Sequence, residues 1–230
     1  MPDFENKRQF TEQESQVNNS FDQRELQFGS PSRLRSLRQS IEAQKLPVVE
    51  SLAKLEQGFD AAISQDRPFL LSASPGSGKT LYAPLAMQRA LQKRGMAGRI
   101  TILEPRRDAT AMAGEGIAAV GGSELGKEVG FSTSEEKRFN RETAIRVITP
   151  GIFLRWLKNG WLNKGEVDGL ILDEIHDPSL DYQQIFGLMK LAQQNGTLPA
   201  TLLTSATPDL KKFQEYLGNI LKNAKITCLN

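Results

Sequence analysis

The sequence is poor in the residues that form covalent cross-links and metal sites. Among its 230 residues it has one cysteine, Cys228, and one histidine, His176. A single cysteine excludes a disulfide within the chain, and one cysteine with one histidine cannot supply the ligands of a structural zinc site. The fold therefore depends on an ordinary hydrophobic core, and a hydrophobic content of 39% is typical of a soluble globular protein.

Excess charge of one sign and long apolar runs are also missing. The net charge is +2, so any surface that attracts nucleic acid must be a local one. No apolar run approaches the roughly 18 residues that a membrane span needs. The N-terminus "MPDFENKRQFTEQ" lacks the apolar core of a signal peptide. We therefore expect no contact with a membrane. We expect a cytoplasmic location, or a nuclear one if the source is eukaryotic.

Two regions of different composition make up the chain. Residues 1–35 are rich in Gln, Asn and Ser and have few apolar residues, so we expect a disordered N-terminal arm. Residues 36–230 form the second region. It opens with helix-like apolar spacing that Pro47 interrupts, which predicts two helices.

Five short apolar runs then predict strands: "PFLLSAS", "RITILEP", "AIRVITP", "GLILDEI" and "ATLLTSAT". Most of them are followed by turn residues and a helical pattern. Strands that are apolar on both faces and alternate with helices indicate an α/β fold, with a mostly parallel sheet and helices on both faces. Ligands of such sheets bind beyond the carboxyl ends of the strands, and the polar motifs of this sequence lie at those ends.

A glycine-rich segment, "ASPGSGKT", separates the first predicted strand from a helix. It matches the phosphate-binding pattern G-x-x-x-x-G-K-[S/T], with Ala73 at the first glycine position. Backbone N–H groups and a helix N-terminus bind phosphate in such loops. Lys79 is expected to reach the β- and γ-phosphates, and the Thr80 hydroxyl to bind Mg²⁺. The residues expected to bind ATP are Ala73, Ser74, Pro75, Gly76, Ser77, Gly78, Lys79 and Thr80.

The run "GLILDEIH" ends in paired carboxylates, Asp173 and Glu174. Combined with a phosphate loop, the pair predicts that Asp173 holds Mg²⁺, directly or through water, and that Glu174 orients the attacking water. By residue type His176 is a candidate base or metal ligand. A base is redundant beside Glu174, and Mg²⁺ prefers oxygen ligands. A histidine that is merely packed at a strand end is a further alternative.

Several segments together resemble the DExH/DEAH-box branch of the superfamily 2 helicases. Motifs I, II and III of that family are matched in order by Ala73–Thr80, by "DEIH" and by "SAT". Between them, "EPRRDATAMA" resembles motif Ia, and "VGFS" and "VITPGIFLR" resemble the segment that leads into motif Ib. The resemblance covers about residues 40–225.

The resemblance implies a RecA-like P-loop NTPase domain that uses ATP and Mg²⁺ and acts on RNA, with DNA a less expected substrate. In that family the Ser-Ala-Thr strand lies between the phosphate-loop strand and the Asp-Glu strand. Ser205 and Thr207 are therefore implied to lie beside His176, which becomes a residue that couples ATP hydrolysis to RNA. The implied catalytic set is Lys79, Asp173, Glu174 and His176. The residues implied to face the nucleic-acid backbone are Pro105, Arg106, Arg107, Thr149 and Gly151.

The sequence also departs from the family pattern. The arginine that commonly follows the Val-Gly-aromatic-Ser segment is replaced by "TSEEKR". No second RecA-like domain, with its arginine fingers, is found within the 230 residues. We expect that domain to be supplied in cis or in trans, and we expect the chain alone to hydrolyse ATP slowly without unwinding. The alternative is a truncated module that binds nucleotide or RNA as a scaffold or regulator.

Overall fold

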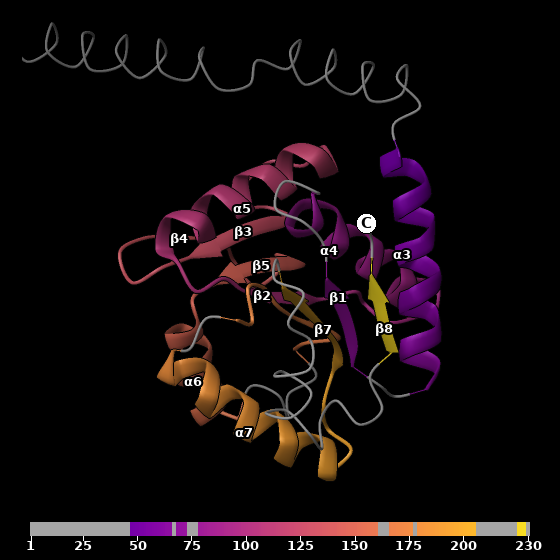
Figure 1. Ribbon diagram of the computed structural model, residues 1–230. Coiled ribbons are helices and arrows are strands. Elements are labelled where there is room, and N and C mark those ends of the chain that lie inside the picture. Colours follow the sequence, from indigo (N-terminus) through magenta and orange to yellow (C-terminus); the bar gives the residue numbers. More distant parts are fainter. Residues whose placement is uncertain are drawn as a thin grey trace, which may run out of the picture. The chain divides into compact units, whose positions relative to one another are not determined.

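The computed structural model describes residues 47–65, 68–72, 78–160, 166–176, 179–205 and 225–228 (Figure 1). The predicted disordered arm, residues 1–35, lies outside these ranges. The predicted domain boundary at residue 36 lies outside them as well and stays a prediction. Within the described ranges, no helix has both the length and the apolar character that crossing a bilayer requires.

The described strands form one eight-stranded sheet in the order β4-β3-β5-β2-β6-β7-β1-β8. Neighbouring strands are parallel, except for the antiparallel pair of β3 and β4. The inner strands β2, β5 and β6 are buried along their whole length, as strands covered on both faces must be. The predicted mostly parallel α/β fold is confirmed. The strands are β1 (Phe69–Ser72), β2 (Ile100–Leu103), β3 (Val129–Ser132), β4 (Lys137–Arg138), β5 (Ile145–Ile148), β6 (Gly169–Leu172), β7 (Ala200–Ser205) and β8 (Lys225–Cys228).

Helices lie on both faces of the sheet (Figure 1). One face is covered by α3 (Pro47–Ser64), α4 (Lys79–Gln92) and α5 (Arg107–Gly121), and the other by α6 (Pro150–Lys158) and α7 (Leu180–Gln194). Local sequence sets where several of them begin. Gly78 precedes α4 with a φ of 77°, which favours glycine. Pro150 occupies the first position of α6, and the Ser179 side chain caps α7 by accepting from the Tyr182 N–H.

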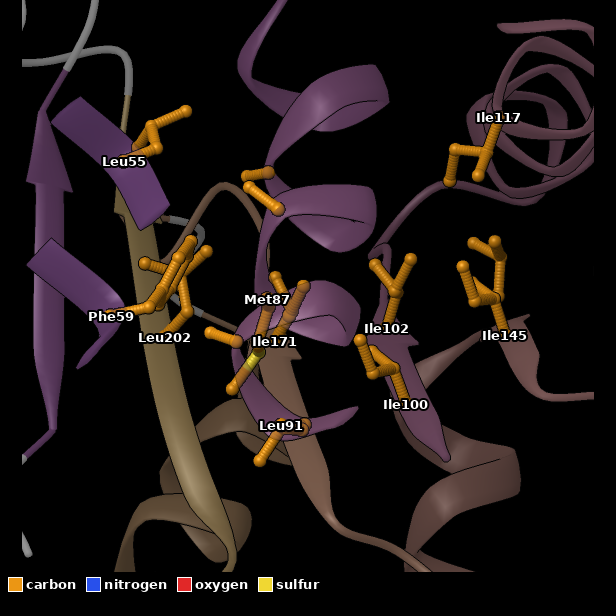
Figure 2. Close-up of a cluster of buried hydrophobic side chains, with 14 of the residues drawn as sticks. Leu55, Phe59, Met87, Leu91, Ile100, Ile102, Ile117, Ile145, Ile171 and Leu202 are labelled. Carbon is orange, nitrogen blue, oxygen red and sulfur yellow. The ribbon is translucent and has the colours of Figure 1, made fainter. Parts of the chain in front are cut away.

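Two hydrophobic clusters, one on each face, hold the helices to the sheet. On the first face Phe59 of α3 and Met87 of α4 lie with Ile171 and Leu202 of the sheet (Figure 2). On the second face, the buried side chains of α6 and α7 pack with the alternate residues of the same strands. The sheet is therefore fixed from both sides, and this fixes the positions of its strand ends.

The sequence predicts β1, β2, β5, β6 and β7, but it misses the three other strands. Strand β3 contains Gly130, which weakens the sequence signal for a strand. The structure requires that glycine, because a Cβ there would lie 2.1 Å from the Arg138 carbonyl oxygen of β4. Strand β4 itself is two exposed charged residues, and the sequence of β8, KITC, has a single aliphatic residue and therefore no apolar run.

Two leucines should differ sharply in how much their substitution lowers the stability of the fold. Leu202 is fully buried on β7, whereas Leu191 of α7 is 55% exposed. We expect Leu202→Ala to lower the free energy of unfolding by about 2–5 kcal/mol, because it removes buried methyl groups and leaves a cavity. Leu191→Ala is the matched control and should change it by less than about 0.5 kcal/mol. Urea denaturation measures both, and equal losses would contradict the assignment of the core.

Candidate functional site

The carboxyl ends of β1, β7 and β6 bring the phosphate-loop residues to the Asp-Glu pair. Strand β7 lies between the other two, and Ser72 pairs with Ser205 while Leu172 pairs with Leu203. The order expected for these strands is therefore observed. Across this edge the Thr80 hydroxyl donates to Oδ2 of Asp173 at 2.6 Å. Of the loop, Gly78, Lys79 and Thr80 are described; Ala73, Ser74, Pro75, Gly76 and Ser77 lie outside the described residues.

Asp173 is only 2% exposed, and several donors hold its carboxylate in place. Oδ1 accepts from the Glu174 backbone N–H at 2.9 Å and from the Thr204 hydroxyl in a short contact. Its backbone carbonyl accepts from the Tyr182 hydroxyl at 2.6 Å, and that hydroxyl also lies 3.1 Å from the Leu103 carbonyl oxygen. Neither Thr204 nor Tyr182 was predicted from the sequence. A threonine directly before "SAT" was the one available signal, and nothing in the sequence pointed to Tyr182.

Glu174 has an unusual backbone and an incompletely satisfied carboxylate. Within the described ranges it is the one residue other than glycine with a positive φ, 50°, a conformation that a side chain disfavours. Its Oε1 lies 3.4 Å from Nζ of Lys79, whose side chain is 6% exposed. Its Oε2 is buried; among the described residues it forms no hydrogen bond, and Nδ1 of His176 lies 3.2 Å away. A carboxylate oxygen has two lone pairs, so Oε2 can accept a hydrogen bond from a water molecule even when the His176 ring donates to it as well.

His176 lies between Glu174 and Ser205. Its Nδ1 is 3.2 Å from Oε2 of Glu174 and 3.4 Å from Oγ of Ser205. With its proton on Nδ1 the ring can donate toward Glu174, and with its proton on Nε2 the ring can accept from the Ser205 hydroxyl. The ring is 40% exposed, so it has a solvent-facing side as well. Thr207, the other expected partner, lies outside the described residues.

The oxygen atoms at this edge suit a hard cation. Mg²⁺ is commonly bound by one or two carboxylates, with substrate phosphates and water completing its shell, and Thr80 and Asp173 supply a hydroxyl and a carboxylate within 2.6 Å of each other. The described residues contain no group of three or more His, Cys, Asp or Glu side chains that could hold a metal ion by themselves. A magnesium ion here would therefore take its further ligands from water and a bound phosphate.

Glu104 is a third carboxylate at this edge, and no role was predicted for it from the sequence. It follows β2, is 3% exposed, and its Oε1 accepts from the Arg106 backbone N–H at 3.3 Å. Burial raises the pKa of Glu104 to about 7, with a further rise from the negative charge of Asp173, while Arg106 opposes the rise. Only its burial marks it as unusual, because in sequence it resembles any charged residue after a strand.

The residues expected to face nucleic acid gather at the ends of β2 and β5, which are neighbours. Leu103 pairs with Ile148, so Pro105 and Arg106 after β2 lie at the same edge as Thr149 and Gly151 after β5. The Arg106 side chain is 76% exposed. Arg107 is 61% exposed and forms an ion pair with Glu135 at 2.6 Å. Gly151 approaches α7 closely, since a Cβ there would lie 3.3 Å from Oδ2 of Asp181.

Comparison with known proteins agrees with this arrangement. The sequence model of the DEAD/DEAH box helicase family matches residues 56–216, which include both the Lys79-Thr80 pair and the Asp173-Glu174 pair. The chain belongs to the DEAD/DEAH box helicase family. The match begins in α3 and runs beyond β7, so it covers most of the described helicase fold.

Individual helicases of this family are similar to the chain over much of its length. "ATP-dependent RNA helicase HrpA" of Borreliella burgdorferi is 32% identical over 177 residues, which are 76% of this chain and 20% of that protein. "ATP-dependent RNA helicase DHX33" of Drosophila melanogaster is 32% identical over 198 residues, which are 82% of this chain and 27% of that protein. "ATP-dependent RNA helicase DEAH13" of Arabidopsis thaliana is 32% identical over 63% of this chain and 12% of that protein. The chain thus spans about a quarter or less of these relatives.

The raised pKa of Glu104 predicts how the stability of this helicase domain varies with pH. In the folded chain the pKa is about 7, against an ordinary value of 4.5. Between these values the folded state binds the proton more tightly, so the free energy of unfolding falls as pH rises from 4.5 to 7 and then levels off. Glu104→Gln removes this dependence. We therefore expect the free energy of unfolding of the variant, relative to that of the wild type, to rise by about 2–3 kcal/mol between pH 4.5 and pH 8.

Glu56→Gln is the matched control for this measurement. Hydrogen bonding to Lys93 holds the pKa of Glu56 below its ordinary value. Stability from Glu56 is therefore lost only as pH falls below about 4.5, and this variant should show a constant difference from wild type between pH 5 and pH 8. Urea denaturation across that range measures both variants. A constant difference for Glu104→Gln as well would contradict the raised pKa.

Proposed function

We propose that the chain is the ATP-binding and ATP-hydrolysing domain of a DExH-type RNA helicase. The observation that carries the proposal is the 2.6 Å hydrogen bond from the Thr80 hydroxyl to Asp173. It joins the start of α4 to the end of β6, the two places where a P-loop NTPase needs its magnesium ligands. The relatives support the proposal, since their names describe them as ATP-dependent RNA helicases.

In this proposal the segment from Ala73 to Thr80 binds the ATP phosphates. The N-terminus of α4 presents backbone N–H groups and a partial positive charge to them. Lys79 is the buried cation of the site and now pairs with Glu174 at 3.4 Å. A bound γ-phosphate would compete for Lys79, which would release Glu174 to act on water.

Thr80 and Asp173 would hold Mg²⁺ in this site. When bound, the ion neutralises negative charge on the phosphate oxygens. The remaining chemistry belongs to Glu174: its buried Oε2 accepts a hydrogen bond from the attacking water and orients it toward the γ-phosphate. Three contacts of Asp173 hold both carboxylates in position. Its side chain accepts from the Thr204 hydroxyl and the Glu174 N–H, and its backbone carbonyl accepts from the Tyr182 hydroxyl.

RNA is the proposed nucleic-acid partner, with DNA less favoured. Pro105, Arg106, Arg107, Thr149 and Gly151 are proposed to line its path at the ends of β2 and β5. The two exposed arginines stand at the N-terminus of α5, where backbone N–H groups also favour phosphate. Such contacts read the backbone and not the base sequence. A second RecA-like domain, in cis or in trans, is proposed to supply the arginine fingers and the other half of the path.

Glu174→Gln tests the proposed hydrolysis. The amide keeps the shape of the side chain but cannot take a proton from water, so we expect kcat for ATP to fall by about 10²–10⁴-fold with nucleotide affinity retained. Phosphate release is measured with and without RNA, and Glu124→Gln, an exposed carboxylate that pairs with Lys127, is the control. Equal rates for wild type and Glu174→Gln under all conditions, including with a second RecA-like domain supplied, would instead favour a non-motor scaffold.

His176→Ala tests the proposed coupling role. The ring contacts Glu174 and Ser205 but lies on the exposed side of the site, so we expect nucleotide affinity to stay unchanged. The stimulation of ATPase activity by RNA should fall, because the variant loses the contact between motif II and the end of β7. Titration with a fluorescent ATP analogue and ATPase assays with RNA separate the two effects. An outright loss of nucleotide affinity would contradict the coupling role.

A further inference from the structure

One of the proposed RNA-facing arginines already has an anionic partner within the chain. Nη1 of Arg107 lies 2.6 Å from Oε1 of Glu135, a distance typical of a charge-assisted hydrogen bond. Both side chains are largely exposed, Arg107 at 61% and Glu135 at 74%. The carboxylate therefore occupies Nη1 of an exposed guanidinium, a donor that an RNA phosphate would also use.

The turn between β3 and β4 holds Glu135 in this position. The Thr133 hydroxyl accepts from the backbone N–H of Glu135 at 3.2 Å and from that of Glu136 at 3.1 Å. The Thr133 N–H in turn donates to the Glu136 carbonyl at 2.8 Å. These bonds close a tight turn and hold the backbone that carries Glu135.

The turn is also fixed relative to α5, on which Arg107 lies. Helix α5 packs closely on β3, since a Cβ at Gly114 would lie 3.1 Å from Cβ of Phe131. In Figure 1 the β3–β4 hairpin runs beside α5. Glu135 and Arg107 are therefore presented to each other by two elements packed together, and their contact does not require either backbone to move.

Electrostatics explains why an anion is favoured at this point. Arg107 is the first residue of α5, where the positive end of the helix dipole disfavours a cation and favours an anion. Asp108 follows in the same turn, and Glu135 adds a negative charge directly at the guanidinium. A phosphate oxygen would satisfy the same requirement with the same geometry.

We propose that Glu135 is an intramolecular competitor of RNA phosphate for Arg107, and that it lowers the affinity of the chain for RNA. The inference rests on the proposed RNA-binding role of Arg107. An exposed ion pair contributes little to stability, so RNA can displace Glu135 at a small cost. Glu135 therefore weakens the contact between Arg107 and RNA phosphate without preventing it.

The competition has a signature in the dependence of binding on salt. Each phosphate neutralised on a single strand contributes a slope of about −0.7 to the plot of log K against log salt. In the wild type, the contact of Arg107 with phosphate frees the Glu135 carboxylate, which attracts a cation and offsets part of the cation release from the RNA. In Glu135→Gln no carboxylate is freed, so the release of cations from the RNA is not offset, and we expect the slope to steepen by up to about 0.7.

The neighbouring residue provides a matched control. Glu136 lies in the same turn, is 48% exposed, and pairs with Arg138 at 2.6 Å and not with Arg107. Glu136→Gln therefore changes the net charge of the chain by the same amount as Glu135→Gln while leaving the Arg107 ion pair in place. Arg107→Gln, alone and combined with Glu135→Gln, completes a double-mutant cycle.

The experiment measures binding of a fluorescein-labelled oligouridylate of about 12 nucleotides by anisotropy across a range of salt concentrations. It uses the 230-residue chain with Mg²⁺ and a non-hydrolysable ATP analogue, after circular dichroism has shown that each variant is folded. We expect Glu135→Gln to tighten binding about two- to fivefold and to steepen the salt slope. Glu136→Gln should do neither, and the double variant should bind no more tightly than Arg107→Gln.

Other outcomes would overturn the inference. Equal gains for Glu135→Gln and Glu136→Gln would show an effect of net charge alone. A gain that persists in the Arg107→Gln background would show that Glu135 does not act through Arg107. Binding that Arg107→Gln weakens and Glu135→Gln leaves unchanged would overturn this inference but keep the proposed RNA contact. Failure of every variant to bind would overturn both.

Discussion

The hydrogen bond between Thr80 and Asp173 is the contact on which the candidate site depends. Thr80 lies in the first turn of α4, which follows β1, and Asp173 follows β6; these two strands are not neighbours, because β7 lies between them. The bond forms only if the three parallel strands end at the same level, and the paired registers of β1 with β7 and of β7 with β6 ensure this. That register in turn depends on two buried hydrophobic clusters, one on each face of the sheet. A one-residue slip of β7 would exchange its two faces and separate the pair.

Charge is the second constraint on this edge. Asp173, Glu174 and Glu104 bring carboxylates together in a largely buried region, where Lys79 is the buried cation. Repulsion among them contributes to the raised pKa of Glu104, and such repulsion costs stability. A divalent cation at Thr80 and Asp173 would lower that cost, and a phosphate group would replace Glu174 as the partner of Lys79. The proposed ligands therefore relieve strain that is present in the folded chain without them.

The sequence alone could predict the parts of the site that repeat as motifs. Lys79, Thr80, Asp173 and Glu174 were visible because a phosphate loop and a strand-end carboxylate pair have fixed spacing along the chain. Supporting residues have no such spacing. Tyr182 reaches the Asp173 carbonyl from α7, and Glu104 is defined by its burial. Strand β4 was not predicted for a related reason. It is a pair of exposed charged residues, and its pairing with β3 depends on the close approach of the two backbones at Gly130.

The segment "TSEEKR" shows how a departure from a family pattern acquires a physical meaning only within the fold. In the sequence it stands where the family resemblance predicts an arginine that contacts nucleic acid. In the structure it also places Glu135 at the guanidinium of Arg107, so the same few residues lack one expected cation of the proposed RNA path and pair another. A net charge of +2 reveals neither change. If RNA binds at the start of α5, its affinity depends on this local balance, because phosphate contacts are governed by the charges within a Debye length of each other.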